Sequence, residues 1–245
     1  MIQYLGEFLG TFILVLLGDG VVAGNVLSKT KEEGTGWVAI VLGWGIACTV
    51  AVYVSGFFSP AHLNPAVTFA MASIGAISWG QVFPFILAQM LGAMAAAFVL
   101  WLHYYPHWAE TKDSGLILAS FSTGPAIRHT ASNFLGEALG TAILVITIMA
   151  IGPNKVAAGL GPIIVGTVIF AVGFSLGPTT GYAINPARDL GPRIMHALLP
   201  IANKGDSDWS YAWIPVLGPI VGGVVGALFY NLVGALLYNM ILGVI

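Results

Sequence analysis

The chain has 245 residues, of which 58% are hydrophobic and only 7% are Asp, Glu, Lys or Arg. A soluble domain carries about 25% charged residues, so this composition excludes a soluble enzyme and a nucleic-acid-binding protein. Residues 37–109 contain no Asp, Glu, Lys or Arg, and the net charge of −2 offers no patch for a polyanion. The composition predicts a protein whose solvent is the lipid bilayer.

Six apolar stretches are long enough to cross the hydrocarbon core, which takes roughly 20 residues. In chain order they cover 5–27, 37–57, 82–102, 134–151, 156–177 and 213–238. The first has no basic stretch before it and no clear cleavage motif, so we expect a retained span rather than a signal peptide. With six spans, both termini lie on the same side of the membrane.

Two further apolar segments, 65–74 and 186–199, are too short to span, and each follows an irregular stretch rich in Gly, Ser or Pro. Irregular backbone at membrane depth is tolerated only where protein or a water-filled cavity covers it. We therefore predict two re-entrant half-helices in an all-α membrane protein. Both open on the same triplet: Asn64, Pro65 and Ala66 in the first, Asn185, Pro186 and Ala187 in the second.

The chain also repeats itself. Residues 7–15 match residues 137–145 at an offset of 130, and the two triplets match at an offset of 121. Each half holds three spans and one half-helix, and because three is odd, the second half is inverted in the membrane. We expect one domain over 1–245, with repeat one at 1–102, a loop at 103–132 and repeat two at 133–245.

The triplets are helix starts, because Asn is a favoured N-cap and Pro is favoured at the first helical position. The Asn side-chain oxygen takes the capping bond and leaves the NH₂ donors pointing off the helix end. Two such ends meeting at mid-membrane present amide donors and positive dipole ends to a hydroxyl or water oxygen, and they repel a cation. The alternative is two ordinary caps at loop–helix junctions.

Residues 59–68 read SPAHLNPAVT and residues 181–192 read GYAINPARDLGP. These segments resemble the two signature loops of the major intrinsic protein family, and the resemblance covers essentially the whole chain. Asp189, directly after Arg188, is similar to the aquaglyceroporin or glycerol-facilitator branch. The resemblance implies an aquaporin-like fold, a homotetramer with one pore per protomer, and cytoplasmic termini in the cell membrane. The loop charges taken alone favour the opposite orientation.

By the same resemblance, a selectivity filter lies on the outer side of the Asn pair and is formed by Trp44, Gly173, Tyr182 and Arg188. Gly173 leaves room, Trp44 and Tyr182 offer an apolar wall, and Arg188 donates to hydroxyls, which suits a small polyol. Backbone carbonyls of the unwound segments continue the polar path: Pro60, Ala61, His62, Tyr182, Ala183 and Ile184. Two residues depart from the family pattern, Pro60 in place of Gly and Tyr182 in place of Phe.

Three acids, Glu7, Glu137 and Asp189, are expected to support the loops. A general acid–base pair of the two glutamates is the alternative, but no nucleophile or metal ligand accompanies them. Asp19 is a further acid in the first span, and we place it in an outer vestibule without a role. Cys48 lies four residues after Trp44, on the same helix face and on the pore wall by resemblance, or else is a buried apolar residue.

The sequence therefore predicts a passive channel for glycerol and related small uncharged solutes, with some water, that excludes ions and protons. Undissociated organic acids such as lactic acid, urea or ammonia are alternative solutes. An alternating-access carrier is a different class that also uses inverted repeats. We expect no cofactor and no metal, no nucleic-acid partner and no enzymatic activity, since a single cysteine excludes a Cys-based zinc site.

Overall fold

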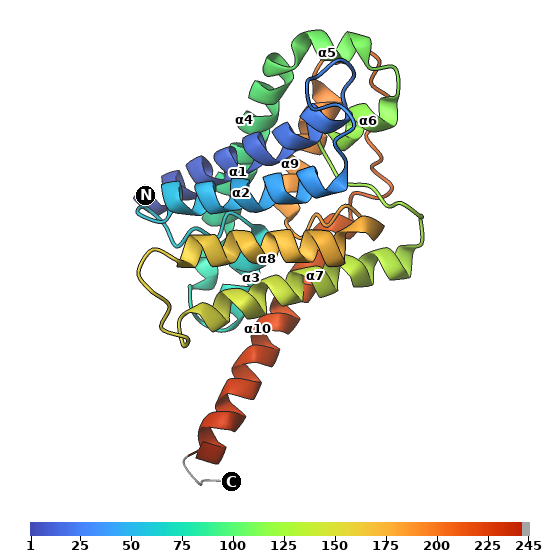
Figure 1. Ribbon diagram of the computed structural model, residues 1–245. Helices are drawn as coiled ribbons and strands as arrows, with labels where there is room; N and C mark the ends of the chain where they lie inside the picture. Colours follow the sequence, from blue (N-terminus) through green and yellow to red (C-terminus); the bar gives the residue numbers. More distant parts are fainter. Residues whose placement is uncertain (242–245) are drawn as a thin grey trace.

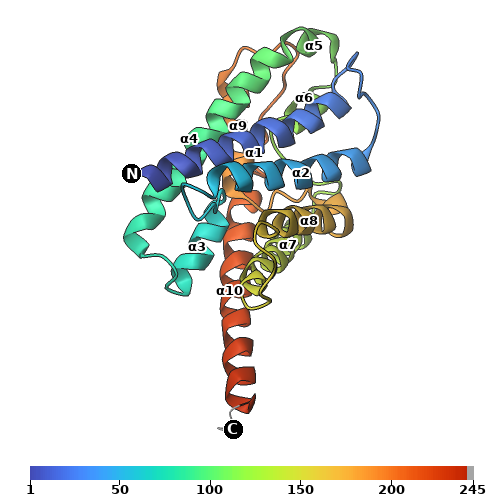
Figure 2. The ribbon, with the colours of Figure 1, turned by 60° about the vertical axis from the view of Figure 1, so that its left-hand side comes forward.

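The computed structural model describes residues 1–241, and this part of the chain folds into α-helices joined by loops, with one 3₁₀ turn. Figure 1 shows the arrangement, and Figure 2 shows it turned. In chain order the elements are α1 (Ile2–Val26), α2 (Trp37–Ser55), α3 (Pro65–Ser73), α4 (Trp79–His103), α5 (Tyr105–Glu110), α6 (Ser114–Ala119), α7 (Thr130–Ile151), α8 (Gly161–Ser175), η1 (Gly177–Thr179), α9 (Pro186–Leu198) and α10 (Ile214–Ile241).

The predicted all-α architecture of six spans and two short helices is confirmed. Among the described residues, α1, α2, α4, α7 and α10 are long and apolar enough to cross a membrane, and α8 is a shorter apolar helix of 15 residues. The two short helices, α3 and α9, begin at Pro65 and Pro186.

The structure differs from the sequence-based expectation at one boundary and adds two short helices in one loop. The fifth span begins at Gly161 rather than at residue 156, because Gly159 adopts a positive φ of 85° and Pro162 lies in the first turn of the helix. The loop predicted at 103–132 contains α5 and α6. The Asp113 side chain caps α6 by accepting from the N–H groups of Gly115 and Leu116, so polar residues that suggested a loop partly serve as helix ends.

The two halves of the chain exchange their short helices. Helix α1 packs against α2 and α4, and α7 packs in the same way against α8 and α10. Helix α3, from the first half, packs against α10 of the second, and α9 packs against α4 of the first. Each short helix is therefore held between the two halves, at the centre of the bundle.

Glycines allow the long helices to touch backbone to backbone, and they do so at repeated positions. A Cβ on Gly92 in α4 would lie 2.3 Å from the carbonyl oxygen of Phe8, and one on Gly222 in α10 would lie 1.9 Å from that of Ala138. Both residues of the second contact follow those of the first by 130 positions. Such close crossings favour helix association in a membrane, where the hydrophobic effect between helices is lost.

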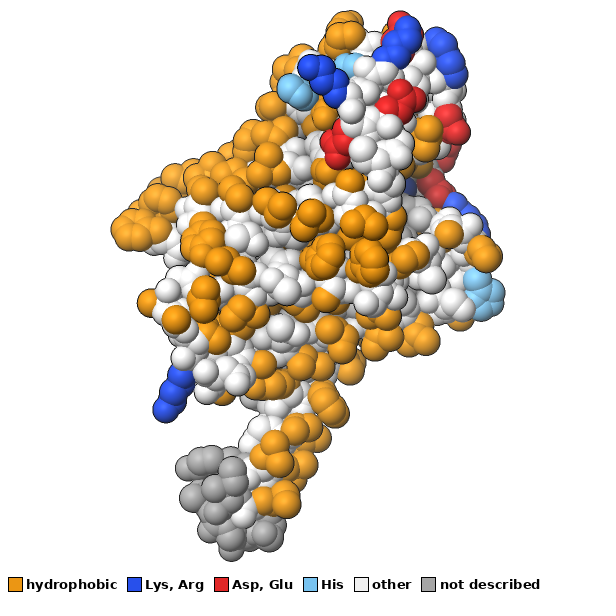
Figure 3. All heavy atoms as spheres, in the orientation of Figure 1, with side chains coloured by type: hydrophobic (Ala, Val, Ile, Leu, Met, Phe, Trp, Pro, Cys, Tyr) orange, Lys and Arg blue, Asp and Glu red, His pale blue; other side chains and the backbone are white. Residues whose placement is uncertain are grey.

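The surface matches a bilayer environment. Charged side chains gather at the end of the molecule where α5 and α6 lie, whereas hydrophobic side chains cover the visible flanks of the helices (Figure 3). The C-terminal half of α10 extends beyond the other helices (Figures 1 and 2), and its outward residues include Leu228, Phe229 and Leu232, each at least half exposed.

Candidate functional site

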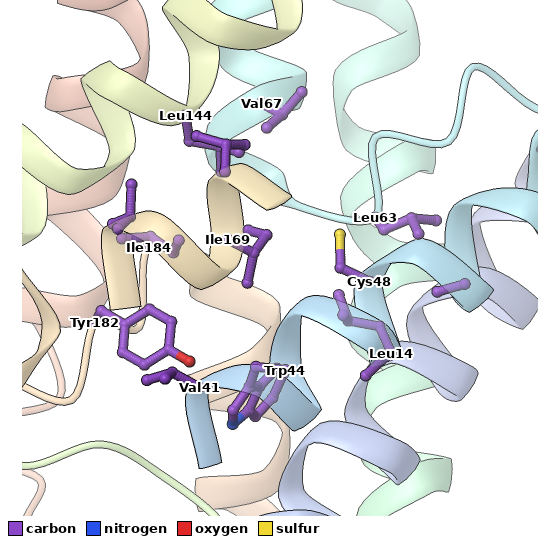
Figure 4. Close-up of a cluster of buried hydrophobic side chains, with 14 of the residues drawn as sticks. Leu14, Val41, Trp44, Cys48, Leu63, Val67, Leu144, Ile169, Tyr182 and Ile184 are labelled. Carbon is purple, nitrogen blue, oxygen red and sulfur yellow. The ribbon is translucent and has the colours of Figure 1, made fainter. Parts of the chain in front are cut away.

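A cavity of about 360 Å³ lies along the centre of the bundle. Figure 4 shows ten labelled side chains around it, and all of them except Val41 line the cavity. These buried apolar side chains therefore form walls of a cavity rather than a solid core. The complete lining is Leu14, Trp44, Cys48, Val52, Pro60, Ala61, His62, Leu63, Asn64, Val67, Met71, Ala76, Ile77, Leu144, Ile148, Val165, Ile169, Tyr182, Ala183, Ile184, Asn185 and Arg188.

The two half-helices meet tip to tip at the cavity. Asn64 Oδ1 accepts from the N–H of Ala66 at 2.8 Å, and Asn185 Oδ1 accepts from that of Ala187 at 3.0 Å. Both residues are therefore the N-caps that the triplets predict. The preceding residues Leu63 and Ile184 belong to the two loops that bring these tips together.

The Asn amides also bind the opposite loop. Asn64 Nδ2 donates to the carbonyl of Ile184, and Asn185 Nδ2 donates to the carbonyl of Leu63, each at 2.8 Å. The expectation that both NH₂ donors of each Asn stay free was thus wrong in part, since one of the two locks the loops together. One N–H of each amide remains for the lumen.

The loops before the half-helices share an unusual backbone. Ala61 and Leu63 adopt φ values of 52° and 51°, and Tyr182 and Ile184 adopt 41° and 42°. The second pair follows the first by 121 positions, as the two Asn residues do. Left-handed conformations of non-glycine residues cost of order 1–3 kcal/mol each, so the surrounding structure must enforce them.

Glu7 supplies part of that enforcement. Its Oε1 accepts from the Ser59 hydroxyl and from the His62 N–H, both at 2.9 Å. Its Oε2 accepts from the Leu63 N–H at 2.7 Å and from Gln89 Nε2 at 2.8 Å. This fully buried carboxylate holds the first loop by its backbone N–H groups.

Glu137 has the same relation to the second loop. Its carboxylate accepts from the N–H of Ala183 at 3.0 Å and from that of Ile184 at 2.8 Å, and it is fully buried. The two glutamates, 130 residues apart, thus bind equivalent backbone groups. The described residues contain no group of His, Cys, Asp and Glu side chains suited to a metal ion.

The predicted filter residues Trp44, Tyr182 and Arg188 line the cavity together. The Arg188 Cζ lies 4.1 Å from the centre of the Trp44 ring, and this face-on contact is a cation–π interaction. No hydrogen bond joins the Arg188 guanidinium to another residue within 1–241, so its donors remain for a solute. Its nearest charged partner is Asp19, at 3.9 Å.

The sequence suggested that Gly173 leaves open space in the filter, but the structure has no open space there. A Cβ on Gly173 would lie 2.5 Å from Tyr182 Cζ, because the Tyr182 ring occupies that room. A Cβ on Gly177 would likewise lie 2.7 Å from Tyr182 Cδ1. Trp37 fixes the same region, since its indole donates to the Gly173 carbonyl at 3.1 Å and its ring meets Tyr182 edge-on.

Asp189 supports a different segment from the one expected. Its Oδ2 accepts from the Thr123 N–H and hydroxyl, both at 2.7 Å, and its Oδ1 pairs with Arg193. Arg193 also donates to the carbonyls of Thr123 and Ser207. Asp189 therefore ties α9 to the segment before α7, whereas Glu137 binds the loop before α9.

Cys48 and Asp19 are both buried, but they lie in different surroundings. Cys48 is buried and lines the cavity between the filter and the half-helix tips. Asp19 is fully buried in α1. It therefore has no exposed surface, and its Oδ1 lies 3.9 Å from Arg188 Nη1.

Sequence reasoning missed several residues of the site. Gln89 joins Glu7 to Thr68, at 2.8 Å and 3.0 Å, and Arg193 is buried without any exposed surface. A single Gln or Arg within an apolar run is the signal that points to such residues, because an intramembrane polar group needs partners. Gly18 and Gly177, on which the filter aromatics lie, carry no comparable signal.

Comparison with known proteins agrees with this architecture. The sequence model of the family described as "Major intrinsic protein" matches residues 1–230. Glycerol uptake facilitator protein 3 of Lactiplantibacillus plantarum is 60% identical over 230 residues, 94% of this chain and 96% of that protein. The glycerol uptake facilitator protein of Streptococcus pneumoniae strain R6 is 58% identical, covering 95% and 99%. The solved structure of the aquaglyceroporin from Plasmodium falciparum superposes with a TM-score of 0.86 at 31% identity, over 97% and 98% of the two chains.

The fold and the lumen at its centre define a multi-pass membrane channel. Asn64 and Asn185, whose amides bind across the two loops, line this cavity together with Trp44, Tyr182 and Arg188. The chain belongs to the major intrinsic protein family.

Proposed function

We propose that this channel conducts glycerol and related small uncharged solutes, with some water. The observation that carries the proposal is the constriction, where Arg188 donors face a lumen whose other walls include the Trp44 and Tyr182 rings. A polyol presents hydroxyls on one side and carbons on the other, so it gains from both kinds of wall. The relatives named as glycerol uptake facilitators support the same solute.

The channel excludes cations and protons, and the charges around the lumen support this. The positive ends of the α3 and α9 dipoles converge at Asn64 and Asn185, and Arg188 adds a full charge nearby. A cation therefore meets repulsion at two successive places. The amide donors of the Asn pair also interrupt a water chain that would carry protons.

The chain is one channel domain of two inverted repeats, 1–102 and 133–245, in a cell membrane with cytoplasmic termini. Paired contacts at a fixed offset support the repeat, namely Gly92 with Phe8 and Gly222 with Ala138. The protein acts as a homotetramer with one pore per protomer, an arrangement that the resemblance implies. It works as a passive channel rather than as an enzyme or a carrier.

Stopped-flow light scattering on proteoliposomes tests this function. Vesicles with the protein are challenged with gradients of glycerol, ribitol, urea, lactic acid or an impermeant osmolyte, and empty vesicles give the background. We expect glycerol to equilibrate faster than the larger polyol ribitol and faster than lactic acid at low pH. If lactic acid or urea equilibrates faster than glycerol, glycerol is not the preferred solute and the proposal is wrong in that respect.

A further inference from the structure

Asp19 is a buried acid in α1 for which the channel architecture gives no role. Its side chain has no exposed surface, and neither carboxylate oxygen has a hydrogen-bond partner among the described residues. A buried polar group without a partner is costly, and a charged one more so. Ionisable residues within membrane spans mark a functional path more often than a packing position.

Among the described residues, the filter arginine is the charged group that lies within ion-pair distance of Asp19, and Asp189 is a more distant acidic neighbour. Asp19 Oδ1 lies 3.9 Å from Arg188 Nη1, and both side chains are buried. Water and salt screen the attraction between buried groups less than the attraction between exposed ones. The Trp44 ring lies on another side of the guanidinium, 4.1 Å from Cζ. Arg188 thus lies between an acidic group and an aromatic face.

Arg193, one turn further along α9, shows the contrast. Its guanidinium donates to Asp189 and to the carbonyls of Ser207 and Thr123, so hydrogen bonds fix it completely. Arg188 has no such bond within 1–241. Its orientation in the lumen therefore depends on Asp19 and Trp44, and these two contacts leave its N–H groups available.

Helix α1 supports both contacts from adjacent positions, although Trp44 itself belongs to α2. The Trp44 ring lies on Gly18, where a Cβ would come within 2.2 Å of it, and the next residue is Asp19. We propose that Asp19 is a positioning residue of the filter, which holds the Arg188 guanidinium against Trp44 and thereby sets the ratio of glycerol to water permeability. This inference rests on the proposed function for its solute.

The consequence for transport follows from size. With its acidic partner removed, the guanidinium reorients into the lumen and no longer presents its donors to a passing hydroxyl group. In that variant the lumen is narrower for glycerol, which is large enough to fill the filter, and glycerol no longer finds its hydrogen-bond donor there. Water is smaller and loses less, so the ratio of the two permeabilities falls.

The test measures glycerol and water permeability of Asp19→Asn in the same proteoliposomes. Asn keeps the shape and removes the charge, and we expect the glycerol-to-water ratio to fall at least threefold. A poorly folded variant reduces the number of channels, which lowers both rates equally and leaves the ratio unchanged. Asp19→Glu, which keeps the charge, should lie closer to the wild type than Asp19→Asn. The control is Thr11→Val, a buried polar site two turns earlier in α1, which should keep the wild-type ratio.

A double-mutant cycle separates positioning from packing. In the Arg188→Val background, Asp19→Asn should change the ratio by less than 1.5-fold, because the group it positions is gone. An unchanged ratio in Asp19→Asn alone, or an equal change in both backgrounds, would overturn the inference. Wild-type vesicles that pass no glycerol would refute the proposed function instead, and the cycle would then be measured with the solute that does pass.

Discussion

Trp44 lies directly on Gly18, so that a Cβ built on Gly18 would come within 2.2 Å of the indole ring. Tyr182 lies on Gly173 in the same way, at 2.5 Å. These separations are far inside van der Waals contact, so any side chain at either glycine must displace an aromatic ring of the filter. The aromatic wall of the constriction is thus shaped by residues without side chains.

Substituting Gly18 by Ala should therefore slow glycerol. The added methyl group pushes the Trp44 ring toward the lumen, and we expect the glycerol permeability to fall at least fivefold. Gly20→Ala is the matched control in the same helix, because a Cβ there meets only Leu100 Cδ1 at 3.8 Å. Equal rates for the two variants in proteoliposomes would show that the ring position does not limit transport.

Replacing Glu137 by Gln should destabilise the second loop. Gln has one acceptor oxygen, so its NH₂ group faces one of the two N–H donors, of Ala183 or Ile184, that the carboxylate now binds. A buried N–H without an acceptor costs about 1–3 kcal/mol. Thermal unfolding in detergent should begin at lower temperature, and glycerol flux should fall.

Glu110→Gln provides the comparison. Lys29 lowers the pKa of the Glu110 carboxyl by hydrogen bonding and by its charge, but both side chains are largely exposed. Exposed pairs add little stability, so this variant should unfold at the wild-type temperature. A Glu137→Gln protein as stable as Glu110→Gln would contradict the role of Glu137 as an anchor of the loop.

The Tyr182 hydroxyl is a buried group without a partner in the described residues. Removing it by Tyr182→Phe breaks no hydrogen bond in the protein, so we expect unchanged or slightly higher thermal stability. Glycerol permeability should stay within about twofold of the wild type, because the ring that forms the apolar wall remains. A larger loss would mean that solutes bind this hydroxyl.

The single cysteine gives a direct probe of the lumen. Cys48 lines the cavity next to the filter, so a mercurial that reacts with its thiol should block glycerol and water together. Cys48→Ser should conduct normally and resist the reagent. Inhibition that persists in the mutant would show that mercury acts elsewhere, since the chain has no other cysteine.

Much of the fold could be predicted because the membrane restricts it so strongly. The length of each apolar run predicted the spans, and Asn64 and Asn185 predicted where α3 and α9 begin, since capping chemistry is local. The offset of 130 between Glu7 and Glu137 predicted equivalent positions for the two acids.

Features that depend on contacts between distant segments could not be predicted. The hydrogen bond from Asn64 to Ile184 depends on how two loops 120 residues apart meet. The proximity of Asp19 to Arg188 likewise depends on the packing of α1 against α9, which the sequence does not show. Helices α5 and α6 are only six residues each, too short to give a periodic hydrophobic pattern.

The dependence of glycerol flux on concentration tests the central claim most directly. A channel conducts through its lumen without a conformational cycle, so the initial rate in proteoliposomes should rise linearly with the glycerol gradient, with a low activation energy and no response to sodium or proton gradients. A rate that saturates, or one that a sodium or proton gradient drives, would contradict a passive channel and indicate a carrier.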